Sequence, residues 1–183
     1  RLDWRSFRGI VLGSNLAKCF ERVLLRRVTL LTSTDEWQAV GGVGVDVRHQ
    51  ILVLVDVLAA RAADGLVTWG AAVDVTRAFP STEHALAALA AHASGARGHV
   101  LRAIVSLIVG VAVRARVAHG QHTDAIFLGV GLLEGAVLSP RLFAGAVDGL
   151  LAALRASGLG VRHGGVWVGA LMLMDDLVIL AGS

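Results

Sequence analysis

With 183 residues, 17 Lys and Arg against 14 Asp and Glu, and a formal net charge of +3, the chain has the length of one domain or one and a half. That charge is compatible with a nucleic-acid partner but too small to indicate one by itself. A single cysteine, Cys19, excludes an intrachain disulfide and gives no basis for a thiolate zinc site, and no histidines form an i, i+4 pair, so zinc has little support.

The apolar content raises the question of a membrane span, because 55% of the residues are hydrophobic. The longest stretch without Asp, Glu, Lys or Arg runs from His84 to Ala96 and includes two histidines. A spanning helix needs about 20 mostly apolar residues, so we expect no transmembrane segment and no membrane partner. The chain begins at Arg1 without a signal peptide and ends soon after an acidic pair, and we interpret it as a piece of a longer protein.

The first predicted element is a helix that Ser14 or Asn15 can cap. Its apolar positions have helical spacing, and they are Leu16, Phe20, Val23 and Leu24. Its other face is basic, through Arg22, Arg26 and Arg27. A solvated face is the simpler interpretation of these arginines, and contact with a phosphate backbone is the alternative.

A glycine-rich loop over residues 35–47 separates this helix from a second one. The loop has no Lys-Ser or Lys-Thr after its glycines, so it does not match a P-loop. The second helix is expected over 48–63 and ends at Asp64-Gly65. One face of this helix is apolar and consists of Ile51, Leu52, Val55 and Leu58.

Leu66 to Val73 predicts a buried strand that delivers Asp74 at its carboxyl end. A helix is expected next, over 81–93, because Pro80 is tolerated at a helix start and Glu83 suits a first turn. A carboxylate where a strand meets a loop is common both in functional sites and in helix caps. Asp74 by itself therefore does not distinguish a functional site from a helix cap.

The middle of the chain predicts a helix over 100–111 and then a hairpin. Its first strand, 112–117, carries Arg114 and Arg116 on one side as an edge strand would, and its second covers 125–128. A glycine turn over 129–135 leads into a helix with Ser139 as N-cap and Pro140 as first residue. This helix is expected to stop at Gly158 and to bury Phe143, Ala146, Val147, Leu150, Leu151 and Leu154. Its N-terminus, preceded by glycines, can face a nucleotide or a template strand.

Residues 166–182 form two apolar runs around Asp175 and Asp176, which predicts a β-hairpin with both acids in its tight turn. Two adjacent carboxylates repel each other unless a cation neutralises them. Mg²⁺ prefers carboxylate oxygens and usually adds phosphate oxygens. A metal site at the lip of a sheet is therefore one interpretation, and an exposed turn, where Asp is common, is the other.

Taken in order, these segments resemble the palm of reverse transcriptases, most closely those of non-LTR retrotransposons and group II introns. The first motif of that family, D-x-x-x-A-F-D-x-V-x-H, is matched at Asp74, Ala78, Phe79 and His84. The second, Q-G-x-x-L-S-P-x-L-F, is matched at Gly135, Leu138, Ser139, Pro140, Leu142 and Phe143. The third, an aromatic followed by x-D-D and an apolar strand, is matched at Met174, Asp175, Asp176 and residues 177–180.

Two upstream segments extend the resemblance to nearly the whole chain. F-R-G-I-V-L, which contains Arg8, resembles the R-P-I-S-L motif of the fingers, and residues 38–51 align with a Q-F-G-F-R-x-G-R-S-T segment through Gln38 and Gly44. The departures are Gly42 and Val45 for two arginines, Pro80 for a second Asp, Glu134 for Gln, and Leu173 for an aromatic. Because basic finger residues help to bind the incoming triphosphate in this family, the resemblance implies a decaying or weakly active copy.

The resemblance implies transfer of a nucleotide from a dNTP to a primer 3′-hydroxyl, assisted by two Mg²⁺ ions about 3.5–4 Å apart, for which Mn²⁺ can substitute. The implied catalytic acids are Asp74, Asp175 and Asp176, which also bind the metal together with Val75. The implied nucleotide-binding residues are Val75, Thr76, Gly135 and Phe79, a steric gate under the sugar whose alternative is core packing. The implied template and primer contacts are Arg8, Glu134, Ser139 and Pro140.

We therefore expect an α+β fold, with partial fingers over 1–65 and a palm over 66–183 whose antiparallel sheet has helices packed on one face, without a thumb. Asp74 should converge with the turn at Asp175 and Asp176. The implied partners are an RNA template, a DNA primer and a dNTP, in an intracellular setting that is nuclear for a non-LTR retrotransposon. One alternative is a degenerate relic that keeps the palm fold and at most binds nucleic acid. The other, a small metal-dependent hydrolase, explains the acids but not the order of the motifs.

Overall fold

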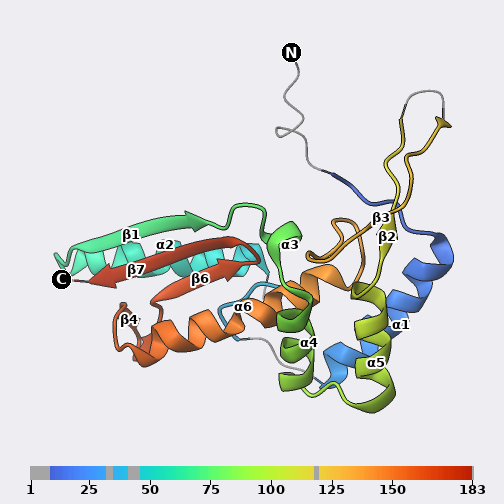
Figure 1. Cartoon of the computed structure of the whole chain (residues 1–183). Helices are drawn as coiled ribbons and strands as arrows, with labels where there is room; N and C mark the ends of the chain where they lie inside the picture. Colours follow the sequence, from blue (N-terminus) through green and yellow to red (C-terminus); the bar gives the residue numbers. More distant parts are fainter. Residues whose placement is uncertain (1–8, 32–34, 41–45, 118–119, 183) are drawn as a thin grey trace. The chain divides into compact units, whose positions relative to one another are not determined.

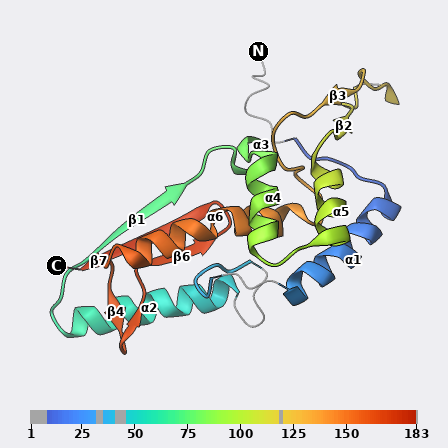
Figure 2. The same ribbon diagram turned by 60° about the horizontal axis from the view of Figure 1, so that its bottom comes forward.

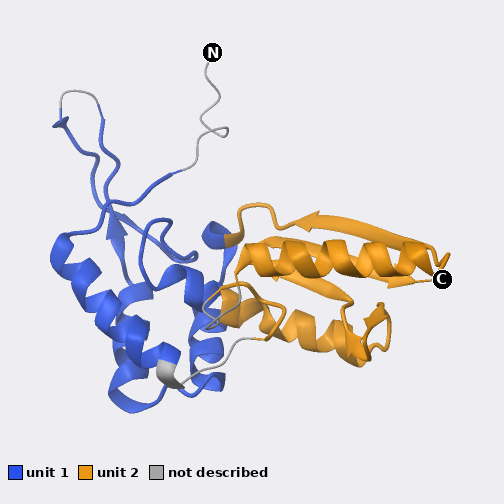
Figure 3. Cartoon of the chain, turned by 180° about the vertical axis from the view of Figure 1, so that it is seen from behind, with its two compact units in different colours: residues 1–32, 79–143 blue, residues 33–78, 144–183 orange. Residues whose placement is uncertain are grey.

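The computed structural model describes residues 9–31, 35–40, 46–117 and 120–182 (Figure 1). The chain forms two compact units (Figure 3). Unit 1 consists of residues 1–32 and 79–143, and unit 2 of residues 33–78 and 144–183. Each unit thus combines two separate stretches of sequence, and the expected division into fingers and palm at residue 65 stays a prediction.

Unit 2 is built on a three-stranded antiparallel sheet. Its strands are β1 (Thr68–Asp74), β6 (Ala170–Leu173) and β7 (Asp176–Gly182), in the spatial order β1-β7-β6. The strand β7 therefore lies between the two others, as Figure 1 shows. A second, two-stranded sheet pairs β4 (Arg162–His163) with β5 (Val166–Trp167). The last four strands of the chain thus form two hairpins, β4–β5 and β6–β7, and Asp175 and Asp176 lie on the second.

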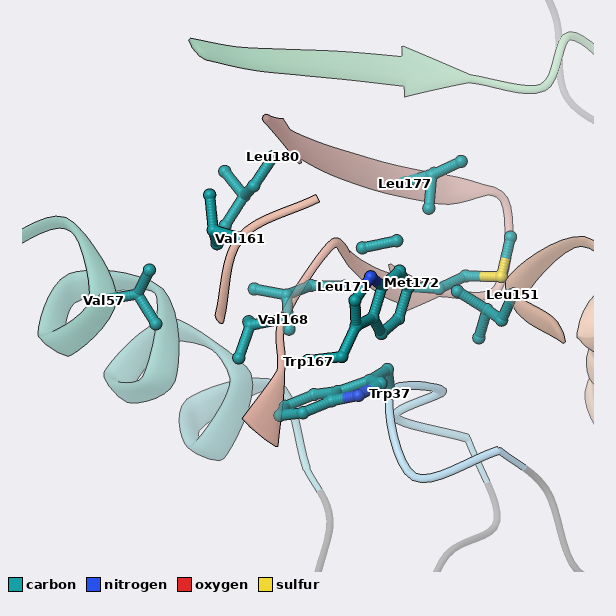
Figure 4. Packing of buried hydrophobic residues seen from close by; sticks show 11 residues of the cluster. Trp37, Val57, Leu151, Val161, Trp167, Val168, Leu171, Met172, Leu177 and Leu180 are labelled. Carbon is teal, nitrogen blue, oxygen red and sulfur yellow. The ribbon is translucent and has the colours of Figure 1, made fainter. Parts of the chain in front are cut away.

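The core of unit 2 lies where α2 (Val47–Ala63), α6 (Ser139–Ala156) and the β6–β7 hairpin contribute apolar side chains (Figure 4). The buried cluster consists of Trp37, Val57, Leu151, Val161, Trp167, Val168, Ala170, Leu171, Met172, Leu177 and Leu180. The strands β6 and β7 thus pack against α2 and α6, two helices that come earlier in the sequence. This packing fixes the position of the hairpin turn in unit 2.

The expectations that β1 and Leu150 are buried are wrong. The strand β1 is exposed along nearly its whole length, because no described layer of unit 2 covers it. The apolar stripe of α2 is exposed as well, and α2 buries Gln50 and Val57 instead. In α6, Leu150 is exposed while its neighbour Leu151 is fully buried. Hydrophobic periodicity locates these elements but does not say which face has a partner.

Unit 1 is mainly helical, with one short hairpin. It contains α1 (Asn15–Leu31), α4 (His84–Ala93), α5 (Gly98–Ile108), β2 (Ala112–Val113) and β3 (Ile126–Phe127). The helices α4 and α5 lie side by side, as Figure 2 shows, and bury small and branched residues, namely Ala87, Ala90, Ala91, Ile104 and Ile108.

The helix expected over 81–93 is interrupted. A short α3 (Ala78–Ser81) ends before Thr82, and α4 begins at His84. The carbonyl of Thr82 accepts the Gly131 N–H and the carbonyl of Phe79 accepts the Leu132 N–H, at 2.9 and 2.8 Å. The break thus provides acceptors that hold the glycine turn of the second motif.

The mixture of helices and antiparallel strands gives an α+β fold, as expected. Among the described residues, no helix combines the length and the apolar character that crossing a membrane requires.

Candidate active site

The predicted convergence of the acids is confirmed within unit 2. Asp74, the last residue of β1, is the direct antiparallel partner of Asp176, the first residue of β7. Directly opposed residues of an antiparallel pair project from the same face of a sheet, with Cβ atoms about 5 Å apart. Asp175 precedes Asp176, and its carbonyl accepts the Val75 N–H at 3.3 Å. Strand pairing therefore brings three carboxylates from distant parts of the sequence to one end of the sheet.

The hairpin turn lies one residue earlier than predicted. Leu173 is the partner of Asp176, so Met174 and Asp175 are the two turn residues and Asp176 already belongs to β7. Met174 has a φ of 55°, whereas Asp175 does not have a positive φ. A positive φ at the first central residue alone is the pattern of a type II′ turn. Asp175 and Asp176 therefore have different backbone environments, although they are adjacent in the sequence.

A second residue with a side chain has a positive φ, and it follows the first acid. Arg77 has a φ of 53°, and Arg77 and Met174 are the only such residues in the described ranges. Backbone strain of this kind concentrates at functional sites. Sequence reasoning missed both residues as parts of the site, because no residue type announces a left-handed conformation at Arg or Met.

The loop after Asp74 is short and exposed. The carbonyl of Val75 accepts the Ala78 N–H at 3.2 Å, and a carbonyl oxygen has a second lone pair that can face a metal. Thr76 and Arg77 are exposed. The loop therefore offers main-chain groups and one cationic side chain next to Asp74.

The acids have the right donor atoms for Mg²⁺, but they do not form a complete cage. Within the described ranges, no group of three His, Cys, Asp or Glu side chains is arranged to hold a metal ion. Mg²⁺ in phosphoryl-transfer sites is usually held by one or two carboxylates, with waters and substrate phosphates as the other ligands. The cross-strand pair of Asp74 and Asp176, with Asp175 beside it, fits that incomplete protein contribution.

In unit 1, Phe79 has a partly exposed ring. It stacks on the ring of Phe143, with centroids 5.1 Å apart and planes at 25°. Phe143 is buried, whereas Phe79 is half-buried. Packing on Phe143 thus fixes the orientation of Phe79 while leaving part of its ring accessible, and the role of steric gate stays a prediction.

The loop of the second motif is held by α1 and by the segment near Val11. The Val11 N–H donates to the Glu134 carbonyl at 2.8 Å. The Glu21 carboxylate accepts the N–H groups of Val137 and Leu138, at 2.5 and 3.1 Å. The amides of Val137 and Leu138, just before α6, are therefore already bonded to an acid, and the approach of a nucleotide or template to the N-terminus of α6 itself stays a prediction.

The remaining predicted site residues lie in unit 1. Gly135 is exposed with a φ of 99°, Ser139 is buried at the start of α6, and Pro140 is half-buried. Arg8 lies outside the described residues, as do Gly42, Gly44 and Val45 of the aligned finger segment.

A groove of about 1210 Å³ runs through unit 1. It is lined by residues 9–13, by the β2–β3 hairpin with Arg114 and Arg116, and by residues 130–134, which end at Glu134. Two arginines and one half-buried acid thus face the same space. The other lining residues are mostly apolar, so contact of this groove with nucleic acid stays a prediction.

The chain has a weak sequence similarity to a retrotransposon polyprotein. The chain is 25% identical over 177 residues to the Retrovirus-related Pol polyprotein from type-1 retrotransposable element R2 of Popillia japonica, covering 96% of this chain and 25% of that protein. No model of a known protein family matches the chain.

Two solved structures of telomerase have a similar fold. Telomerase from Candida albicans in complex with the TWJ fragment of telomeric RNA matches with a TM-score of 0.59 and 13% identity, over 91% of this chain and 30% of that one. Apo telomerase from Candida tropicalis, truncated from its C-terminal domain, matches with a TM-score of 0.55 and 12% identity, over 90% of this chain and 34% of that one. The chain thus spans a minor part of the length of each of these proteins. The three motifs in order, the convergence of their acids and these likenesses together support a reverse-transcriptase-like domain.

Proposed function

We propose that the chain carries the catalytic acids of an RNA-directed DNA polymerase, which transfers a nucleotide from a dNTP to a primer 3′-hydroxyl. The observation that carries this proposal is the pairing of Asp74 with Asp176 beside the turn residue Asp175. Phosphoryl transfer depends mainly on positioning and on charge neutralisation, so converging carboxylates at an accessible sheet end are the necessary protein contribution.

Asp74, Asp175 and Asp176 would hold two Mg²⁺ ions, with the main chain of Val75 as a further ligand. When bound, the ions would neutralise charge on the phosphates and lower the pKa of the primer hydroxyl. The main-chain amide of Thr76 would orient the triphosphate, whereas the Val75 N–H, which the resemblance also implied, already donates to the Asp175 carbonyl. Because the aligned finger segment lacks two arginines of the family, the exposed Arg77 is the basic residue that we assign to the triphosphate.

The residues to which the resemblance assigns sugar selectivity and template contacts lie in unit 1. The accessible part of the Phe79 ring would exclude a 2′-hydroxyl, and Gly135 would lie near the nucleotide. Template and primer contacts would come from Arg8, Ser139 and Pro140, and from the groove that Arg114, Arg116 and Glu134 line. An RNA template and a DNA primer are then the expected partners, in the nucleus for a non-LTR retrotransposon.

Metal binding tests this proposal directly, because its protein ligands are all present in the chain. Mn²⁺ binds such sites more tightly than Mg²⁺ and can be titrated through paramagnetic relaxation of water protons. We expect weak Mn²⁺ binding that Asp74→Asn and Asp175→Asn each reduce. Asp124→Asn is the matched control, since Asp124 is an exposed acid of unit 1.

The alternative is a non-catalytic relic that keeps the fold and at most binds nucleic acid. The departures at Pro80, Glu134 and Leu173 favour it, as does the incomplete metal cage among the described residues. If Mn²⁺ binding is indifferent to Asp74→Asn and Asp175→Asn, the polymerase proposal fails and the relic remains. If Asp74→Asn, Asp175→Asn and the control Asp124→Asn reduce Mn²⁺ affinity equally, a specific metal site at Asp74 and Asp175 is also contradicted.

A further inference from the structure

The turn that carries Asp175 contains a residue in an unfavourable backbone conformation. Met174 has a φ of 55° and is the first of the two residues between the paired Leu173 and Asp176. Glycine usually occupies this position in a two-residue hairpin turn, because a Cβ atom is strained there. A contact from outside the hairpin can offset this cost.

Gln38 supplies that contact. Its Oε1 accepts the main-chain N–H of Met174 at 3.0 Å, and its side chain is fully buried, at 0% exposure. The Gln38 Nε2 has no hydrogen-bond partner among the described residues. An amide buried in this way is costly, so a hydrophobic residue of similar size would be the better choice at this position if packing were its only role.

The backbone around Gln38 is fastened to the same hairpin. The Ala39 N–H donates to the Met172 carbonyl at 2.9 Å, and the Met172 N–H donates to the Trp37 carbonyl at 2.8 Å. From α2, Gln50 Nε2 donates to the carbonyls of Trp37 and Met172, at 2.7 and 3.0 Å. The Gln38 amide is thus held at a fixed position relative to β6.

We propose that Gln38 is a positioning residue for the acidic turn. Its amide oxygen holds Met174 in the left-handed conformation, and this orients the following carboxylate of Asp175. The effect on the turn follows from the geometry alone, whereas the consequence for metal binding rests on the proposed polymerase function. Without the Gln38 contact, the turn populates other conformations. The apparent metal affinity is then the intrinsic affinity multiplied by the fraction of chains whose turn keeps the metal-binding conformation.

A double-mutant cycle tests this role. Gln38→Leu removes the acceptor. We expect it to weaken Mn²⁺ binding about fivefold, which is the change in affinity that the free energy of one hydrogen bond corresponds to. Met174→Gly removes the need for the contact, because glycine adopts a positive φ without strain. In the Met174→Gly background, Gln38→Leu should therefore change Mn²⁺ affinity and the stability of unit 2 much less than in the wild type.

Val57→Ala is the matched control, because Val57 is, like Gln38, fully buried in unit 2, but its apolar side chain cannot form a hydrogen bond to the turn. Its effect should be the same with Met174 or glycine at position 174. If Gln38→Leu leaves wild-type Mn²⁺ binding unchanged, the positioning role is refuted. If the wild type shows no binding that depends on the acids, the proposed function fails. The double-mutant cycle measured on the free energy of unfolding of unit 2 then decides alone. If the effects of Gln38→Leu and Met174→Gly on this free energy are coupled, the positioning role is supported, and if they are additive, it is overturned.

Discussion

The glycine of the second motif is a sharp test of how unit 1 is packed. Gly135 has a φ of 99°, and a Cβ atom built on it would lie 2.8 Å from the carbonyl oxygen of Val11. The obstacle is backbone, which the bond from Val11 N–H to the Glu134 carbonyl fixes at 2.8 Å. Gly135→Ala therefore introduces both a strained φ and a close contact that no side chain can relieve.

The two effects set the expected magnitude. A residue with a side chain in a sparsely populated backbone region costs about 1–3 kcal/mol, and the smaller entropy of the unfolded alanine chain returns about 0.4–1 kcal/mol. With some displacement of the Val11 segment included, we expect a loss of about 2 kcal/mol in the free energy of unfolding of unit 1. Gly129→Ala is the matched control, because Gly129 also lies in unit 1, has no positive φ and has open space around its Cβ position, so alanine should change the stability of unit 1 far less than at position 135.

Native-state amide hydrogen exchange is the suitable assay. The described tryptophans, Trp37, Trp69 and Trp167, all lie in unit 2, so their fluorescence does not follow unit 1. A loss of about 2 kcal/mol should accelerate exchange of the slowest amides of α5 about 30-fold. If Gly135→Ala exchanges as slowly as the wild type, the second-motif loop does not run against the Val11 segment as described.

Three further predictions concern charge, packing and pH. Glu134→Gln should tighten binding to an RNA–DNA primer–template in fluorescence anisotropy at low salt, because an acid is removed from the groove that Arg114 and Arg116 also line. Equal affinity would mean that Glu134 does not face nucleic acid. Leu151→Ala should cost about 2–5 kcal/mol of stability and Leu150→Ala under about 1 kcal/mol, because only Leu151 is fully buried; equal losses by urea denaturation would contradict this core. The bond from the His49 N–H to Asp46, and Arg48 nearby, lower the pKa of that carboxyl. Its stabilisation of α2 is therefore present above the ordinary pKa and lost as pH falls through the lowered value. Hydrogen exchange of α2 amides should show this loss in the wild type but not in Asp46→Asn, and the same acid sensitivity in both would refute it.

The sequence alone predicted the order of the elements and the identity of the acids. Apolar runs bounded by turn residues located β1, β6 and β7, and the N-cap and glycine signals located α6 closely. The convergence of Asp74 with the acidic hairpin also followed from the motifs, because the palm resemblance places both at strand ends, and the register confirms it. These features depend on local chemistry, which a single sequence carries.

Which faces are buried, and which polar groups hold the site residues in place, depended on tertiary structure. The stripe of α2 that is most regular in the sequence is exposed, because a periodic pattern does not specify which face finds a partner. Met174 takes a left-handed φ because Gln38, from a distant segment, accepts its N–H. The amides before α6 are occupied by Glu21 of α1. Each of these contacts joins residues that are remote in the chain, so only packing in three dimensions decides which carboxylates face open space and which polar groups hold them there.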